Sequence, residues 1–234
     1  MVMKTFAAVL ASLLFSGSLS TQELILKAFN YVKSTPLPFE FSRHSMRVRI
    51  QPDYYFPYGV WEDNVLNDKV WIDIGLTVSE NRPEENWPFT TLKRTFVPAE
   101  GDFRIGLVLM GALDYSKYML ITINNAGNYI DAIEVCACLA AGPQVGAIIP
   151  KQWQISDDLK VTVYQIKPTS CAPLRFDQNI SYPINARRID RTYQIGQDGR
   201  FSLLQTITYQ PRDYSLNQFA SKDYNIWQGD EIPE

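Results

Sequence analysis

The chain has 234 residues and a formal net charge of −3, and 46% of its residues are hydrophobic and 20% charged. This is the composition of a globular protein that is long enough for one large β domain or two small ones. A mildly acidic surface repels phosphate backbones, which makes nucleic acid a poor partner. No stretch after the first twenty residues has eighteen consecutive apolar residues, so the sequence predicts no membrane span in the mature chain.

Residues 1–20 have the pattern of a secretory signal peptide. Lys4 is their only charge, an apolar run follows it, and the small residues Ser18 and Ser20 are spaced like a cleavage site. The alternative interpretation is a buried N-terminal helix. We therefore expect an exported protein of the periplasm or cell surface, with a mature chain that starts near Thr21.

The mature part is expected to begin with one helix over 21–33. Its apolar residues repeat at i, i+3, i+4 and i+7, and Pro36 bars the helical state at the preceding residue. These apolar residues are Ile25, Ala28, Phe29 and Val32.

Strand patterns follow the expected helix at frequent intervals. Alternating or continuous apolar residues predict strands over 46–50, 70–78, 89–97, 103–110 and 159–166. Two hairpins are expected over 119–139 and 193–209, because Asn and Gly in the turns at 125–128 and 197–199 tolerate positive φ. The polar tail beyond Pro211 is expected to be ordered where Tyr224, Ile226 and Trp227 dock.

Strands joined by turns rather than by helices predict antiparallel sheets. The expected fold is mainly β: an antiparallel sandwich or a curled barrel-like sheet, with the N-terminal helix covering one edge or face. We expect a single domain over 21–234, and any subdivision would fall near 98–102.

The chain has few residues that suit a metal or a nucleophilic catalyst. Cys136 and Cys138 lie two apart in a predicted strand, and either could pair with Cys171 in an oxidising compartment. Burial as small apolar residues is the interpretation we favour for these cysteines. A zinc site needs about four ligands, and the chain offers only His44 besides these thiols. His44, the only histidine, also lacks any catalytic motif around it. We therefore predict no catalytic residue, no metal and no cofactor.

Other charged residues give no clear pattern of chemistry. The densest basic group, Arg187, Arg188 and Arg191, is interpreted as a solvated loop. A glycosidase needs two carboxylates about 5–9.5 Å apart in space, which spacing along the chain does not report. The carboxylates available for such a pair are Asp53, Glu62, Asp63, Asp131 and Asp157.

The segment 52–61 is expected to be an aromatic loop and is the one speculative ligand-binding site. Exposed aromatic rings with neighbouring acids could stack on sugars and bind their hydroxyls, although the rings could equally cover the end of the core. The residues proposed for this site are Tyr54, Tyr55, Tyr58, Trp61, Asp53 and Glu62.

Several phrases of the sequence resemble a group of exported, often lipid-anchored, β-rich envelope proteins of Gram-negative anaerobes. The resemblance implies an envelope location, assigns no activity and carries over no functional residue. This chain departs from the lipid-anchored members because it has no cysteine at the expected cleavage point. The phrases are 37–39 after the first helix, 118–124 with 126–131, 155–163 and 193–201.

We therefore expect a non-enzymatic binding or interaction protein of the cell envelope, whose partner is a glycan or an envelope protein. The alternative is a glycan-binding module or glycosidase that uses the aromatic segment. A third hypothesis is a structural component whose N-terminal helix docks on a partner.

Overall fold

The computed structural model describes residues 20–41, 54–56, 89–98, 101–112, 115–140, 147–169, 183–215, 218 and 224–234. This part of the chain is mainly β with one α-helix, which confirms the expected fold class at that level. Its elements are α2 (Thr21–Tyr31), β1 (Ser34–Thr35), β2 (Phe39–Phe41), β3 (Tyr54–Phe56), β4 (Phe89–Phe96), β5 (Phe103–Ala112), β6 (Tyr115–Asn124), β7 (Tyr129–Ala140), β8 (Ala147–Ile155), β9 (Lys160–Pro168), β10 (Ile184–Ile195), β11 (Phe201–Thr208), β12 (Arg212–Tyr214) and the 3-10 helix η3 (Ile226–Gln228).

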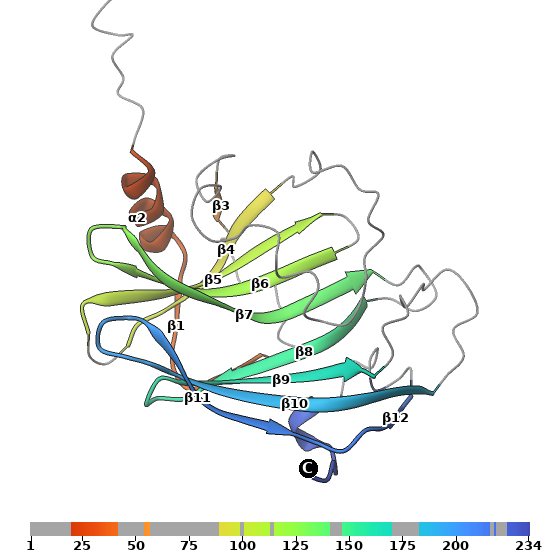
Figure 1. The fold of residues 1–234 in the computed structure, drawn as a ribbon. Helices are drawn as coiled ribbons and strands as arrows, with labels where there is room; N and C mark the ends of the chain where they lie inside the picture. The colour runs from red at the N-terminus through yellow and green to blue at the C-terminus, as the bar shows by residue number, and fades with distance from the viewer. Residues whose placement is uncertain are drawn as a thin grey trace, which may run out of the picture.

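The strands form one sheet in the order β1-β4-β5-β6-β7-β8-β9-β10-β11 (Figure 1). The short strands β2, β3 and β12 pair with β8, β4 and β10. Every pairing is antiparallel except that of β1 with β4. Within the described ranges β11 pairs only with β10, so no hydrogen-bonded ladder closes the sheet into a barrel.

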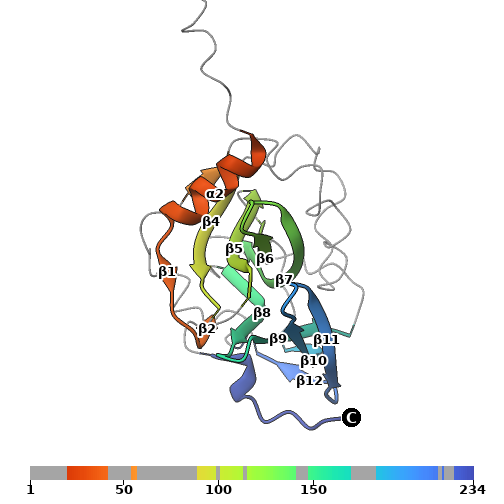
Figure 2. The same cartoon turned by 90° about the vertical axis from the view of Figure 1, so that its left-hand side faces the viewer.

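The sheet curls so that its two halves share one core (Figure 2). Phe96 of β4 and Trp153 of β8 are four strands apart in the sheet, yet their ring centroids lie 6.0 Å apart. Phe41 of β2 stacks on Trp153 at 5.8 Å and also contacts Tyr118 of β6 at 5.2 Å. The fully buried members of this core are Phe96, Ile105, Leu120, Val135, Cys136, Trp153 and Val161.

Two hairpin turns lock the curl at one end of the sheet. The β6–β7 and β10–β11 hairpins are both present, as the Asn/Gly and Asp-Gly signals predicted. Thr122 Oγ1 on β6 donates to the carbonyl of Gly199 in the second turn (2.7 Å), where φ is +78°. The N–H of Phe201 donates to Asp131 Oδ2 on β7 (2.9 Å). These bonds fix the distance between the two hairpins.

Helix α2 covers the outer face of β4–β6, where it buries the predicted stripe of Ile25, Ala28, Phe29 and Val32. Its first turn is a capping box: the N–H of Glu23 donates to Ser20 Oγ (3.3 Å), and the N–H of Ser20 donates to Glu23 Oε2 (2.7 Å). The helix ends at Tyr31, two residues before the predicted end, because the chain then turns into β1 beside β4.

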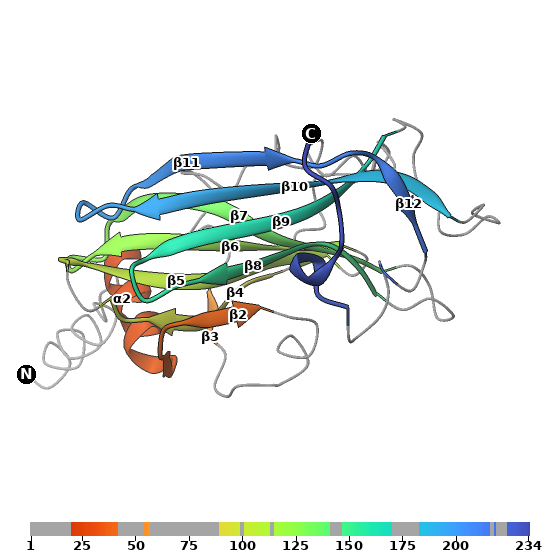
Figure 3. The same ribbon diagram turned by 90° about the horizontal axis from the view of Figure 1, so that it is seen from below.

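The C-terminal segment covers the outer face of β8–β10 (Figure 3). Ile226 is fully buried, and the ring of Trp227 lies 5.3 Å from that of Tyr164 on β9. Gln152 on β8 bonds the backbone at both Tyr224 O (3.0 Å) and Ile226 N (2.9 Å). The predicted docking of this tail is confirmed at these residues.

Strand β8 is among the elements that the sequence does not predict. Pro150 and the nearby glycines suggest a connection over 140–150, but Ala147–Pro150 belong to the strand and Trp153 is central to the core. Burial on both faces removes the alternation that identifies other strands, since Lys151, Gln152 and Trp153 are all buried. The predicted strands over 46–50 and 70–78 lie outside the described residues.

Gly106 on β5 lets α2 lie close to the sheet. A β-carbon there would be 2.5 Å from Phe29 Cζ and 2.9 Å from Leu92 Cδ1. We expect Gly106→Ala to push the helix outward and lower the free energy of unfolding by about 1–3 kcal/mol. Urea unfolding measures this loss against the exposed control Ser202→Ala, and equal stability of the two variants would contradict the close packing.

Candidate functional site

The predicted aromatic site falls mostly on residues that the structure does not describe. Tyr54 and Tyr55 lie in β3, paired with Leu92 and Thr91 of β4, so residues 54–56 form a strand and not a loop. Asp53, Tyr58, Trp61 and Glu62 lie outside the described residues, as do His44, Asp63 and Cys171. The glycan site therefore stays a prediction.

Asp131, one of the carboxylates considered for catalysis, has a structural position. Its Oδ1 accepts the N–H of Ala132 (2.8 Å), and its Oδ2 accepts the N–H of Phe201 (2.9 Å). Both oxygens therefore accept backbone N–H groups, and Oδ2 joins β7 to β11. Asp157, the other described candidate, is exposed in the turn between β8 and β9.

The arginine group on β10 corrects a prediction. Arg187, Arg188 and Arg191 lie in a strand and not in a solvated loop, and Arg188 is buried. Arg188 Nε and Nη2 donate to Asp190 Oδ1 (2.8 Å) and Oδ2 (2.7 Å). The charged residues hide the alternation of buried and exposed positions in this strand. A charged side chain can be buried here because a partner neutralises it, either two positions along the strand or elsewhere in the fold.

Glu231 in the C-terminal segment joins two arginines, the buried Arg188 and the partly exposed Arg212. Its Oε2 accepts from Arg188 Nη1 (3.2 Å), and its Oε1 accepts from Arg212 Nη2 (2.9 Å) and Tyr214 Oη (2.9 Å). Burial favours a higher pKa for Glu231, but its backbone N–H, Tyr214 and Arg212 outweigh burial, so the pKa lies below its usual value.

This ionic cluster anchors the tail and is not suited to catalysis. Arg188 also donates to the Ile226 carbonyl (2.9 Å) and lies over the ring of Tyr209 (4.7 Å). The carboxylate oxygens of Glu231 and Asp190 already accept strong donors, and neither residue lines a described cavity. A buried carboxylate that is held ionised and fully bonded cannot readily accept a substrate proton.

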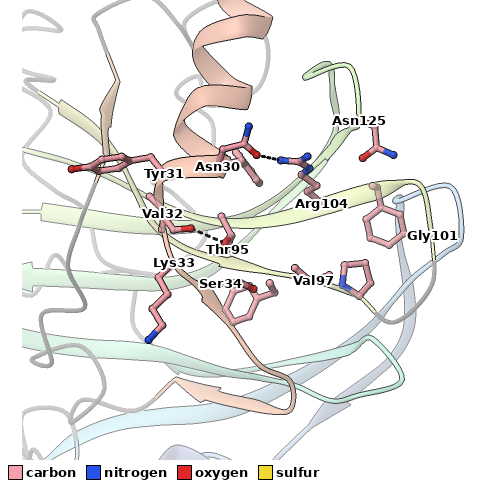
Figure 4. Close-up of a pocket in the computed structure, with 14 residues that line it drawn as sticks. Asn30, Tyr31, Val32, Lys33, Ser34, Thr95, Val97, Gly101, Arg104 and Asn125 are labelled. Atoms are coloured by element: carbon pink, nitrogen blue, oxygen red, sulfur yellow. Dashed lines mark hydrogen bonds between the residues drawn. The ribbon is translucent and has the colours of Figure 1, made fainter.

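A cavity of about 560 Å³ lies where α2 ends against β1 and the β4–β5 turn (Figure 4). Its lining residues include Asn30 and Tyr31 from the end of α2, Lys33 and Ser34 from the segment that follows it, Thr95 from β4, Val97 and Pro98 directly after β4, Phe103 and Arg104 from β5, and Asn125 from the β6–β7 turn. A volume of this size suits a small ligand.

The charges that line this cleft are both positive, on Lys33 and Arg104. Arg104 Nη1 donates to Asn30 Oδ1 (2.7 Å), which uses one of its five N–H groups and fixes the direction of the guanidinium. Tyr31 and Val97 supply apolar surface and are 55% and 69% exposed. Thr95 Oγ1 donates to the Val32 carbonyl (3.3 Å) and holds the end of the helix against β4.

The sequence analysis missed this cleft. Lys33, Arg104 and Asn125 are far apart in the chain, and only the docking of α2 on β4–β6 brings them together. Single residues of this kind belong to no motif, so no local signal could have identified them.

Comparisons with known proteins give no relative: no family model, curated protein or solved structure matches the chain. Within the described ranges, no three His, Cys, Asp or Glu side chains gather as metal ligands. The described helices include none with the length and apolarity that crossing a bilayer requires.

Glu231 makes stability depend on pH. Because its pKa is lower in the folded state, its contribution is complete above the unfolded value of about 4.3 and disappears as pH falls through the folded value. We expect Glu231→Gln to leave Arg188 and Arg212 short of a counter-charge and to cost about 3 kcal/mol at neutral pH.

The measurement is urea unfolding of the wild type and Glu231→Gln between pH 7 and acid. Stability of the variant should fall less steeply below about pH 4 than that of the wild type. Glu40→Gln, at an exposed position of β2, is the matched control. Identical pH profiles for wild type and Glu231→Gln would contradict the role assigned to this carboxylate.

Proposed function

We propose that the protein is an exported, non-enzymatic binding protein, which holds a small anionic ligand with an apolar body in the cleft between α2 and the β4–β5 turn. The observation that carries this proposal is the pairing of Lys33 and Arg104 with the exposed apolar surface of Tyr31 and Val97. A carboxylate or phosphate would contact the cations while its apolar part lies on that surface.

The described lining residues include no acidic side chain, which supports this ligand class. They supply two cations and several polar amides and hydroxyls, so an anion would be attracted to this part of the wall. The end of α2 places backbone carbonyls nearby, whose partial negative charge Lys33 and Arg104 offset. Selectivity for anions would thus come from these two side chains.

The architecture supports binding over turnover. We infer a sandwich-like fold, because the two halves of the curled sheet share one core and the described pairings leave it open. A rigid sheet holds β4 and β5, while Asn30 positions Arg104 from the helix. The described residues that line the cleft include no histidine and no carboxylate, the side chains that most often act as general bases.

Ligand binding can be tested with benzoate and hexanoate, followed by protein NMR, against the neutral analogues benzyl alcohol and hexanol. We expect the anions to bind more tightly than the alcohols and to shift resonances of residues around α2 and the β4–β5 turn. Arg104→Ala should weaken benzoate binding by about fivefold, which corresponds to an exposed ion pair of about 1 kcal/mol.

Arg187→Ala is the matched control, since it removes the same charge at the far end of β10. Added salt should weaken benzoate binding in the wild type and have little effect in Arg104→Ala. Equal binding of benzoate and benzyl alcohol, or equal loss in both arginine variants, would contradict an anion site at this cleft.

The capping box supports a cleavage point before Ser20. Cleavage after Ser20 would remove the cap and place a positive α-amino group at the helix N-terminus, where it is unfavourable. Cleavage after Ser18 keeps the cap and still leaves Ser16 and Ser18 as the small residues that the peptidase requires.

We therefore expect intact mass spectrometry of the protein from the extracytoplasmic fraction to give a chain that starts at Leu19. Ser20→Ala should lower the free energy of unfolding of this product by about 1 kcal/mol, because it removes the helix cap. A product that starts at Thr21 with unchanged stability would contradict the importance of the cap, and an unprocessed cytoplasmic chain would contradict export.

A further inference from the structure

We propose that β11 is a pairing edge through which two copies of this chain form an antiparallel, two-fold symmetric dimer. β11 is the last strand of the sheet and has a described neighbour, β10, on one side only. An edge strand presents unpaired backbone N–H and C=O groups that another strand can bond. Figure 3 shows β11 at the border of the sheet.

The composition of β11 lacks the usual protection of an edge. Phe201–Thr208 contains no charge and no proline, the two features that most often prevent edges from pairing. Residues 202–206 are all exposed, and Leu203 and Leu204 are 55% and 56% exposed. Two adjacent exposed leucines on an uncharged edge strand favour burial against a partner.

The edge already accepts a strand at one end. The C-terminal residues pair antiparallel with it through a bridge between Tyr209 and Pro233, and the N–H of Glu234 donates to the Thr208 carbonyl (2.9 Å). No described residue pairs with the edge over 202–207, whereas the N–H of Phe201 already donates to Asp131 of β7. A second strand that arrives antiparallel would continue this pairing toward the β10–β11 turn.

Symmetry and charge identify the second strand as β11 of another copy. Leu204 is the extra residue of a bulge, since Thr192 and Tyr193 of β10 pair with Gln205 and Leu203. A two-fold axis near Leu204 places the bulges together and lays residues 202–203 of one copy against 205–206 of the other.

The same axis brings opposite charges together at both ends of the strand pair. Arg200 precedes β11 and is 67% exposed, with Asp198 Oδ2 at 3.8 Å from its Nε. Glu234 lies beside the other end of β11 and is 42% exposed, with its Oε1 3.1 Å from Arg187 Nη1. Antiparallel pairing sets Arg200 of each copy against Glu234 of the other. The uncharged centre adds no repulsion, so the edge is complementary to itself.

Sedimentation velocity of the purified protein over about 1 to 200 µM tests the dimer, since one strand pair is a small interface with expected micromolar affinity. Leu204→Lys should raise the dissociation constant by about tenfold or more, because two like charges would meet at the axis. Val97→Lys adds the same charge at an exposed apolar residue away from β11 and should leave association unchanged. All variants carry the same N-terminal segment, so differences in association between them come from the substitutions.

Charge exchange and cross-linking test the geometry. Arg200→Glu and Glu234→Arg should each weaken the dimer, and the double variant should restore it. Leu204→Cys should form a covalent dimer under mild oxidation, whereas Val97→Cys should not. A monomer at every concentration, an open-ended series of oligomers, a dimer that persists in Leu204→Lys, or a double variant without rescue would each overturn the proposal.

Discussion

The contact of Phe96 with Trp153 determines how the rest of the molecule is arranged, because it joins strands that are four positions apart in one sheet. Once β4 and β8 meet through their side chains, the inner faces of both halves are buried together and exclude water. Burial of large aromatic residues makes the largest favourable contribution to the stability of a sheet of this size. The outer faces then remain, and each requires a cover of its own.

The two covers use different interactions. α2 buries an apolar stripe on β4–β6, and its stability follows from area removed from water. The C-terminal segment combines the apolar residue Ile226 with Glu231, which bonds the buried Arg188 and the partly exposed Arg212. A buried ion pair contributes little to net stability because desolvation opposes it, but it strongly disfavours any arrangement that leaves one charge unpaired. The ionic contacts of the C-terminal segment thus determine its position more than they contribute to net stability.

The sequence predicts an element correctly where the signal for that element lies within its own residues. The helix stripe, the strands β4, β5 and β9, and the two hairpins are visible because alternation or turn chemistry is local. The sequence does not predict β8, whose two buried faces remove the alternation. It also does not predict the burial of Arg188, which depends on Glu231 forty-three residues away. The cleft could not be predicted at all, since Lys33 and Arg104 meet only after α2 docks.

Phe103 connects the two surfaces to which we assign binding. It lines the cleft beside Arg104, and a β-carbon at Gly199 would lie only 3.2 Å from its Cγ, so its ring supports the turn that leads into β11. Thr122 and Asp131 hold the same turn against β6 and β7. The start of the β11 edge and the wall of the cleft therefore depend on one packed turn. A ligand in the cleft would contact a rigid part of the fold, and the pairing edge begins from that same rigid part. Phe103 and Gly199 thus form a physical contact between the cleft and the turn that leads into β11, through which ligand and dimer could be coupled.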